Sequence, residues 1–260
     1  MGLNSFMMWL LLAVGGLSSG LLAGLLGIGG GTVLVPILVT LGYSYNQSVA
    51  TSSLAIVMTS ISGTIQNWRM GYLNWRHVIL LGLPAILTAL LGAYLVTQLS
   101  DYFKEAAFGI LLLINILLLS WRKRLSSQKN NSQKSQINPI LARSATGATA
   151  GLLAGLFGIG GGAIMVPLQM LLLGEKIKTA IQTSLGAIVI SSIAACLGHA
   201  QSGNVLWLEG LVLGTGGLIG AQFSTRFLPK LPDTIVSLMF RSLLAILALY
   251  FFWRASISYQ

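Results

Sequence analysis

The sequence predicts an all-α polytopic membrane protein built from two homologous repeats of inverted topology. Three observations predict this fold class: an apolar composition, a long motif that occurs twice, and an uneven distribution of basic residues. Of the 260 residues, 55% are hydrophobic and only 8% are charged, whereas soluble globular domains carry about 25% charged residues. Apolar runs near the roughly 20 residues that cross a bilayer recur along the chain. We therefore expect the chain to lie in a lipid bilayer.

The doubled motif indicates a tandem duplication. Residues 20–36 read GLLAGLLGIGGGTVLVP and residues 151–167 read GLLAGLFGIGGGAIMVP, and the two agree at 13 of 17 positions. The match continues at the same offset of 131 residues, which aligns Ser52-Ser53-Leu54 with Thr183-Ser184-Leu185. The sequence thus divides into three parts: a first membrane repeat (residues 1–121), a basic flexible linker (residues 122–141) and a second membrane repeat (residues 142–260).

Each repeat is expected to contain one broken apolar segment followed by three spans. In the first repeat these four segments are residues 6–42, 48–66, 77–99 and 105–121. In the second repeat they are residues 144–174, 180–198, 205–227 and 235–253. The linker between the repeats is poor in apolar residues, which is typical of a solvated, flexible segment.

The broken segment determines the predicted topology. As one straight helix, residues 143–175 would be about 48 Å long, whereas the hydrocarbon core of a bilayer is roughly 30 Å thick. Glycine accepts left-handed conformations, so GIGGG is a natural place for the chain to reverse. We therefore expect a helical hairpin with its tip at the glycines and a total of about eight to ten membrane helices. Three spans follow each hairpin, and this odd number places the two repeats in opposite orientations.

The basic residues favour this inverted topology, because cytoplasmic loops of membrane proteins hold most of the Lys and Arg. In the inverted topology, twelve basic residues share the cytoplasmic side: Arg69, Arg76, Arg122, Lys123, Arg124, Lys129, Lys134, Arg143, Lys176, Lys178, Arg226 and Lys230. Only Lys104 and Arg254 lie on the other side. If each broken segment crossed once, the division would be nine against five. The same loop rule explains the net charge of +10 without a nucleic-acid partner.

The glycine motifs are candidate substrate-binding elements. Helix N-termini and exposed backbone N–H groups attract anions, and paired breaks in inverted repeats are typical of the binding sites of secondary transporters. The candidate residues are Gly27, Gly29, Gly30 and Gly31 in the first repeat, and Gly158, Gly160, Gly161 and Gly162 in the second. The alternative is close helix packing, which we expect for Gly20 and Gly24 and for Gly151 and Gly155.

Hydroxyl groups after the motifs are further candidates. Ser52 and Ser53, together with Thr183 and Ser184, could complete an oxyanion cage, or they could bond to helix carbonyls. Arg241 is the one basic residue well inside a predicted span, which favours an anion. It could instead extend to the membrane interface.

Other side chains exclude several classes of protein. All five acidic residues fall in loops or at span ends, which argues against a cation as substrate. No pattern typical of an enzyme, a metal site or a cofactor site is found. We expect Gln66, Asn67, Gln169 and Gln222 to join helices, and we expect His77 and His199 to lie at the interface without a special role.

The residues discussed above resemble the sulfite exporter TauE/SafE family of membrane permeases. The doubled GLLAGLLGIGGG…VP motif, the ATSSL segment at residues 50–54, and the turns at residues 71–75 and 203–207 carry this resemblance. It implies a multi-span transporter of the inner (plasma) membrane with a cytoplasmic linker. The implied cargo is a small anion: sulfite, a sulfonate such as sulfoacetate, or a related organosulfur or carboxylate anion. The resemblance to thiosulfate-handling permeases that use several cysteines is weaker, because Cys196 is the single cysteine here.

The leading hypothesis is a permease that moves small anions by alternating access, with the two GIGGG hairpins forming a site near the membrane midplane. Its expected partners are the anion and the lipid bilayer, and a homo-oligomer stays open. Two alternatives also stay open: a non-transporting membrane subunit and a passive anion channel.

Overall fold

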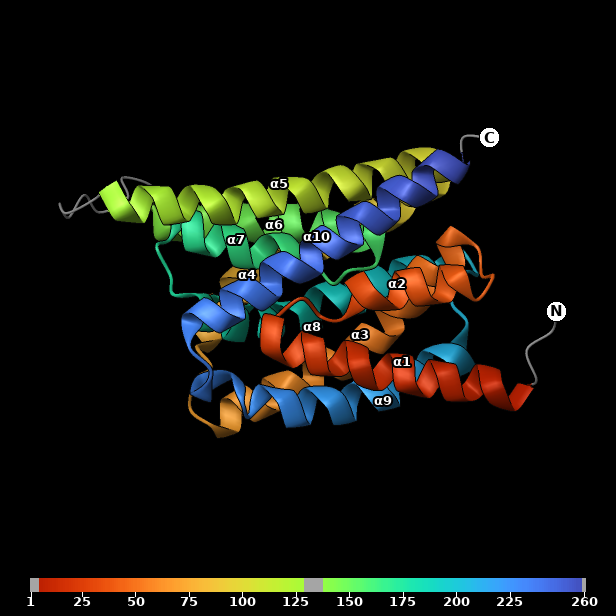
Figure 1. The fold of residues 1–260 in the computed structure, drawn as a ribbon, viewed down its shortest axis with the longest axis horizontal. Coiled ribbons are helices and arrows are strands. Elements are labelled where there is room, and N and C mark those ends of the chain that lie inside the picture. The colour runs from red at the N-terminus through yellow and green to blue at the C-terminus, as the bar shows by residue number, and fades with distance from the viewer. Residues whose placement is uncertain (1–4, 129–137, 259–260) are drawn as a thin grey trace.

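The computed structural model describes residues 5–128 and 138–258, and within these residues it consists of helices and their connections. The first half contains α1 (Ser5–Leu26), α2 (Gly31–Thr40), α3 (Tyr45–Arg69), α4 (Trp75–Leu95) and α5 (Asp101–Gln128). The second half contains α6 (Pro139–Phe157), α7 (Gly162–Leu172), α8 (Ile177–Gln201), α9 (Trp207–Thr225) and α10 (Asp233–Ser258). Six of these helices are long and apolar enough to cross a membrane. The predicted all-α architecture is thus confirmed for the described residues (Figure 1).

The two halves repeat the same order of elements. Each has five α-helices, and a short 3-10 turn precedes the fifth, at Val96–Gln98 and Leu228–Lys230. Helix α7 has 11 residues and α2 has 10, so the elements that follow are offset by 132 residues instead of 131. As a result, the structural counterpart of Ser52 is Ser184 and not Thr183, which corrects the alignment made from the sequence.

Glycine conformations explain the two breaks. Gly27, Gly29 and Gly30 have φ angles of 68°, 74° and 88°, and Gly158, Gly160 and Gly161 repeat this pattern with 63°, 70° and 80°. A side chain with a Cβ is strained in this left-handed region. Helix α1 therefore ends before the first glycines, and α2 begins after them.

The predicted linker begins later than expected. Helix α5 continues to Gln128, past the predicted end of the span at residue 121. Arg122, Lys123 and Arg124 are strong helix formers, so the polar sequence does not end the helix there. Helix α6 begins at Pro139, where the Asn138 side chain caps the N–H of Ile140. The rest of the predicted linker, residues 129–137, lies outside the described residues.

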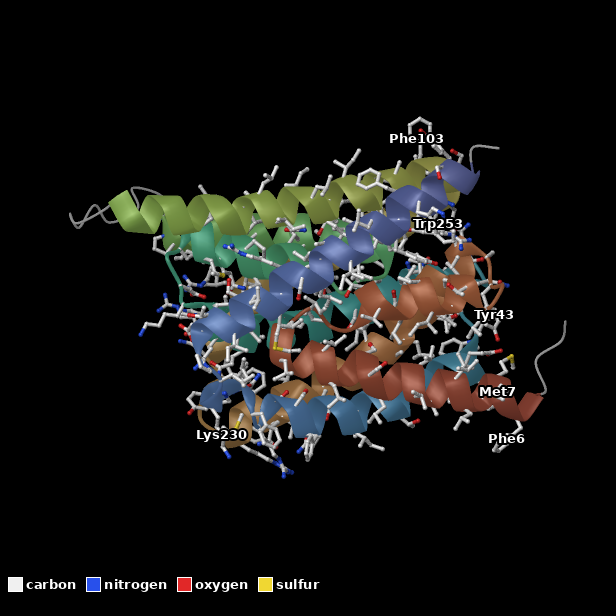
Figure 2. The ribbon with its side chains drawn as sticks, in the orientation of Figure 1. Phe6, Met7, Tyr43, Phe103, Lys230 and Trp253 are labelled. Carbon is white, nitrogen blue, oxygen red and sulfur yellow. The ribbon has the colours of Figure 1, made fainter. Side chains whose placement is uncertain are left out.

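Packing between the halves is reciprocal. Helix α1 packs on α9, and its counterpart α6 packs on α4, while α3 packs on α8 and α5 on α10. Exchanging the two halves leaves this set of contacts unchanged, which is the signature of two-fold pseudosymmetry. The large exposed apolar side chains point outward from this bundle (Figure 2).

Two glycine seams join the halves. A Cβ on Gly20 of α1 would collide with the backbone of Gly217 on α9, and a Cβ on Gly151 of α6 would collide with the backbone of Ala85 on α4. Gly24 and Gly155 approach α9 and α4 equally closely. The predicted packing role of these four glycines is confirmed, because only residues without a Cβ permit such contact.

Helices α3 and α8 occupy the centre of the bundle. In their most apolar stretches 72% and 78% of the residues are buried, against 50% or fewer in the other four candidate spans. Both glycine breaks face this central pair, so the fold brings the two doubled motifs to the middle of the molecule.

Candidate functional site

The two glycine breaks contact each other at the centre of the molecule. We define the first turn as residues 27–30 and the second turn as residues 158–161. A Cβ on Gly31, the first residue of α2, would collide with the carbonyl oxygen of Gly158. Reciprocally, a Cβ on Gly162, the first residue of α7, would collide with the carbonyl oxygen of Gly27. The structure therefore brings together the glycines of both predicted half-sites.

Two isoleucines fill the space beside the turns. Cγ2 atoms of Ile56 on α3 and Ile188 on α8 would lie 2.9–3.2 Å from a Cβ on Gly29 or Gly160. These isoleucines are 132 residues apart and occupy equivalent positions, and Ile56 is fully buried, as is Ile188. The turns are thus closed against each other in this structure.

The turns present backbone donors. In the described parts of the chain, the N–H groups of Gly29, Gly30, Gly160 and Gly161 donate to no backbone carbonyl. The N-terminus of a helix carries partial positive charge because its first N–H groups lack partners within the helix. Helices α2 and α7 both begin here, so the turns carry positive potential without a charged side chain.

Hydroxyl groups around the turns donate to carbonyls. Ser52 Oγ lies 2.8 Å from the carbonyl oxygen of Gly158 and 2.9 Å from that of Val49. Ser19 Oγ donates to the carbonyl of Gly30 at 2.9 Å, and Ser191 Oγ donates to that of Gly160 at 3.1 Å. These bonds offset the negative ends of the carbonyl dipoles and leave the N–H groups as the unpaired backbone groups. The sequence gave no sign of Ser19 and Ser191, because neither lies next to a glycine motif in the chain.

The other predicted site residues lie at varying distances from the turns. Ser53 donates to the carbonyl of Val49 on its own helix at 2.9 Å. Ser184 accepts a hydrogen bond from Gln169 Nε2 at 2.8 Å, and Thr183 is buried beside it. Arg241 lies on α10, whose main neighbour is α5. A binding role for these four residues stays a prediction.

Polar residues expected to join helices mostly do so. Gln222 Nε2 donates to Gln66 Oε1 at 2.9 Å and connects α9 to α3, and Gln169 connects α7 to α8. Asn67 is the exception, since neither of its amide atoms has a partner in the described structure. His199 is fully buried, and its Nε2 lies 2.9 Å from the carbonyl of Gly155. The expectation that His199 is interfacial was therefore wrong.

One end of the bundle joins three helix ends through charged side chains. Arg143 on α6 forms an ion pair with Glu175, which follows α7. His77 Nδ1 on α4 lies 3.2 Å from Arg143 Nη2. Close by in the sequence, Lys178 Nζ on α8 pairs with Asp233 Oδ1 on α10 at 3.4 Å. We call this end, which also carries Lys230 (Figure 2), the basic end.

The opposite end repeats this arrangement with other residues. Tyr43, which follows α2, donates to Glu209 Oε1 on α9 at 3.4 Å and contacts Met8 Sδ on α1 at 3.7 Å. Lys104 Nζ on α5 donates to Asn46 Oδ1 on α3 at 2.8 Å. Burial and the nearby carboxylate of Glu209 raise the pKa of Tyr43, so its phenol keeps the proton that it donates. Tyr43 lies far from Lys230 in Figure 2.

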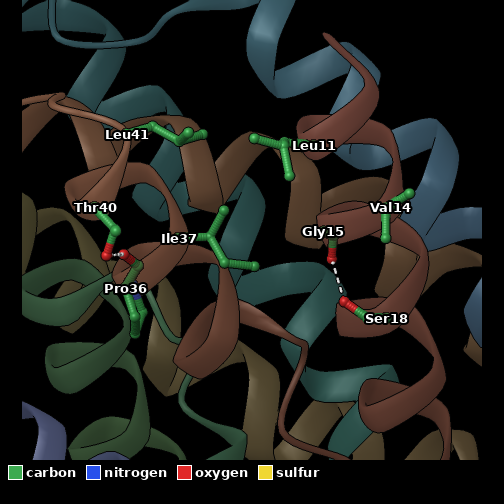
Figure 3. Close-up of a pocket in the computed structure, with 8 residues that line it drawn as sticks. All are labelled: Leu11, Val14, Gly15, Ser18, Pro36, Ile37, Thr40 and Leu41. Carbon is green, nitrogen blue, oxygen red and sulfur yellow. Dashed lines mark hydrogen bonds between the residues drawn. The ribbon is translucent and has the colours of Figure 1, made fainter. Parts of the chain in front are cut away.

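A pocket of about 430 Å³ lies between α1 and α2, away from the contact between the turns (Figure 3). Its lining residues are Leu11, Val14, Gly15, Ser18, Pro36, Ile37, Thr40 and Leu41. The hydroxyls of Ser18 and Thr40 are bonded to the carbonyls of Gly15 and Pro36 in their own helices. Leu11 and Val14 are exposed. This apolar pocket offers an anion no unpaired donor, so we do not assign the site to it.

A cluster of three or more His, Cys, Asp or Glu side chains that could hold a metal ion is not found among the described residues. The candidate site therefore consists of backbone groups, hydroxyls and apolar side chains.

Comparison with known proteins identifies the family. The family model described as sulfite exporter TauE/SafE matches residues 11–251. The probable membrane transporter protein YunE of Bacillus subtilis is 27% identical, over 93% of this chain and 96% of that protein. The probable membrane transporter protein MJ0441 of Methanocaldococcus jannaschii is 24% identical, over 92% of this chain and 94% of its own. A probable membrane transporter protein of Xylella fastidiosa is 28% identical, over 91% and 92%. The chain belongs to the TauE/SafE sulfite exporter family of multi-pass membrane transporters.

Proposed function

We propose that this protein is a secondary transporter that moves small anions by alternating access. The observation that carries the proposal is the contact between the two glycine turns, whose unpaired N–H groups lie at the start of α2 and α7. Such groups bind anionic oxygens without a charged side chain. The two turns are the half-sites of one central binding site.

The proposed cargo is sulfite, a sulfonate, or a related organosulfur or carboxylate anion. The positive potential of the turns favours an anion, and Glu175, Glu209 and Asp233 lie near helix ends and not beside the turns. Sulfite is the anion in the printed description of the matching family model. All of these candidates have oxygen atoms that accept hydrogen bonds from N–H groups.

The proposed topology has two inverted repeats, each beginning with a re-entrant hairpin. The ion pair between Arg143 and Glu175 supports it, because these residues lie near the two ends of the second broken segment. The contact between Met8 and Tyr43 supports the same reversal in the first half. The counterpart helices α5 and α10 run in opposite directions in Figure 1. In this topology the protein lies in the inner membrane with its basic end and linker in the cytoplasm.

The proposed transport cycle opens the turns to one side at a time. With the turns packed together and flanked by Ile56 and Ile188, the structure corresponds to a closed state. Separation of the turns on one side would expose the N–H groups to water and to the anion.

Flux measurements in proteoliposomes that contain only this protein test the proposed function. We expect saturable uptake of radiolabelled sulfite that changes with an imposed pH gradient and is inhibited by one of sulfoacetate, sulfate or acetate. Flux that never saturates and ignores gradients would indicate a passive channel. Folded protein that moves none of these anions would contradict the proposal and favour a non-transporting subunit.

Cysteine labelling tests the inverted topology. Gly42 and Gly174 are counterparts, as are Gly71 and Gly203, and all four have open space where a Cβ would lie. After replacement of the buried native Cys196, single cysteines at these four sites should react in opposite pairs. A membrane-impermeant thiol reagent added outside intact cells should label Gly42→Cys and Gly203→Cys but not Gly71→Cys and Gly174→Cys. Labelling of both counterparts from the same side would contradict inversion.

A further inference from the structure

One hydroxyl beside the first turn has no partner. Thr32 is the second residue of α2, its side chain is fully buried, and its Oγ1 makes no hydrogen bond within the described structure. Buried polar side-chain atoms nearly always have a partner, and leaving one unpaired is costly. A buried hydroxyl that is unpaired in the closed state is therefore available to a ligand.

The position of Thr32 directs this hydroxyl toward the turn. In an α-helix, Cα–Cβ bonds tilt toward the N-terminus, and the N-terminus of α2 follows directly after Gly30. The N–H groups of Gly29 and Gly30 at this turn donate to no backbone carbonyl of the described chain. The nearby hydroxyl of Ser19 is already bonded to the carbonyl of Gly30. Thr32 thus adds an O–H donor to N–H donors that are also unpaired.

The second turn lacks this group. The residue equivalent to Thr32 at the start of α7 is Ala163, which has no hydroxyl. The two otherwise similar half-sites therefore differ in one hydrogen-bond donor.

We propose that Thr32 is a specificity-determining residue of the central site and donates its hydroxyl proton to an oxygen atom of the bound anion. The first turn then binds a substrate oxygen through N–H and O–H donors, while the second turn offers N–H donors alone. The ligand class is a small oxyanion, with sulfite as the probe. This inference rests on the proposed function.

The test compares variants of the full-length protein in sulfite flux and in thermal unfolding. Thr32→Val removes the hydroxyl with little change in shape, and Thr32→Ser retains it. Thr146→Val is the matched control, because Thr146 is also fully buried but its hydroxyl is bonded to the carbonyl of Ala142 at 2.8 Å. A hydrogen bond to a charged ligand is worth about tenfold or more in affinity. We therefore expect Thr32→Val to raise the KM for sulfite about tenfold, and we expect Thr32→Ser and Thr146→Val to stay near the wild type.

Thermal unfolding separates a ligand role from a structural one. Thr32→Val should not lower the Tm without sulfite, because no intramolecular hydrogen bond is lost. It should, however, reduce the rise in Tm that sulfite produces in the wild type, since that rise depends on affinity. A wild-type KM and a wild-type sulfite shift in Thr32→Val would overturn this inference alone. A wild-type protein that neither moves nor binds sulfite or the competing anions would overturn the proposed function together with it.

Discussion

Replacing Gly162 with alanine is expected to reduce sulfite flux at least about tenfold, and replacing both Gly31 and Gly162 is expected to abolish it. Each new Cβ would collide with a carbonyl oxygen of the opposite turn, at Gly27 or Gly158. Backbone atoms cannot rotate away as a side chain can, so the turns would have to separate. Overpacking of this kind costs about 1–3 kcal/mol, and about 1.4 kcal/mol corresponds to tenfold in a population. The closed state through which alternating access passes would become rare.

The conformation of these glycines makes the test specific. Gly31 and Gly162 are not among the glycines with positive φ, and alanine favours a helix more than glycine does. A loss of flux would therefore come from the contact between the turns and not from backbone strain. Gly63→Ala is the matched control in a buried helix, because its Cβ would meet only side-chain atoms of Leu185 and Thr225, at 3.2 Å or more. Normal flux in Gly162→Ala would show that transport does not require the turns to close.

Much of the fold could be predicted because it depends on local composition. Apolar runs located the helices, and the GIGGG motif located both breaks, since three glycines in each turn have left-handed conformations. Helix ends were less accurate. Helix α5 extends to Gln128 because Lys and Arg favour helices as strongly as many apolar residues do.

The register of the repeats could not be read from identity alone. Matching letters aligned Ser52 with Thr183, but the one additional residue of α7 makes Ser184 the counterpart of Ser52. Equivalent contacts of Ile56 and Ile188 with both turns show the correct offset. A conservative insertion inside an apolar helix leaves no mark in composition, whereas it rotates every later side chain by about 100°.

The roles of the site hydroxyls depend on contacts between the halves, which the sequence does not encode locally. Ser52 lies beside the second turn only because α3 packs against the other half, and its proton is used by the carbonyls of Val49 and Gly158. Thr32 was not singled out from the sequence, because a hydroxyl without a partner is visible only once its surroundings are known. Spacing along the chain located the turns, and only the fold shows which donors around them are unpaired.

Alanine at Gly20 or Gly151 is expected to destabilise the whole protein, by about 1–3 kcal/mol for each substitution. The Cβ at Gly20 would collide with Gly217, and the Cβ at Gly151 with Ala85, so α1 would have to move from α9 and α6 from α4. The two seams involve different helix pairs, so the losses should add in the double variant. The measurement is the Tm of purified protein in detergent. Gly109→Ala is the control, because its Cβ would meet only the Phe252 ring, at 3.3 Å.

The seams also limit which parts of the molecule can move during transport. Each one joins the first helix of one half to the fourth helix of the other through backbone contact, so rocking one intact half against the other would break both seams. Units composed of α1 with α9 and of α4 with α6 can move without that cost. Below their lowered Tm, Gly20→Ala and Gly151→Ala should therefore keep a wild-type KM for sulfite, measured per folded molecule. A raised KM in these variants would show that the seams are part of the moving interface, and that the halves themselves are the rocking units.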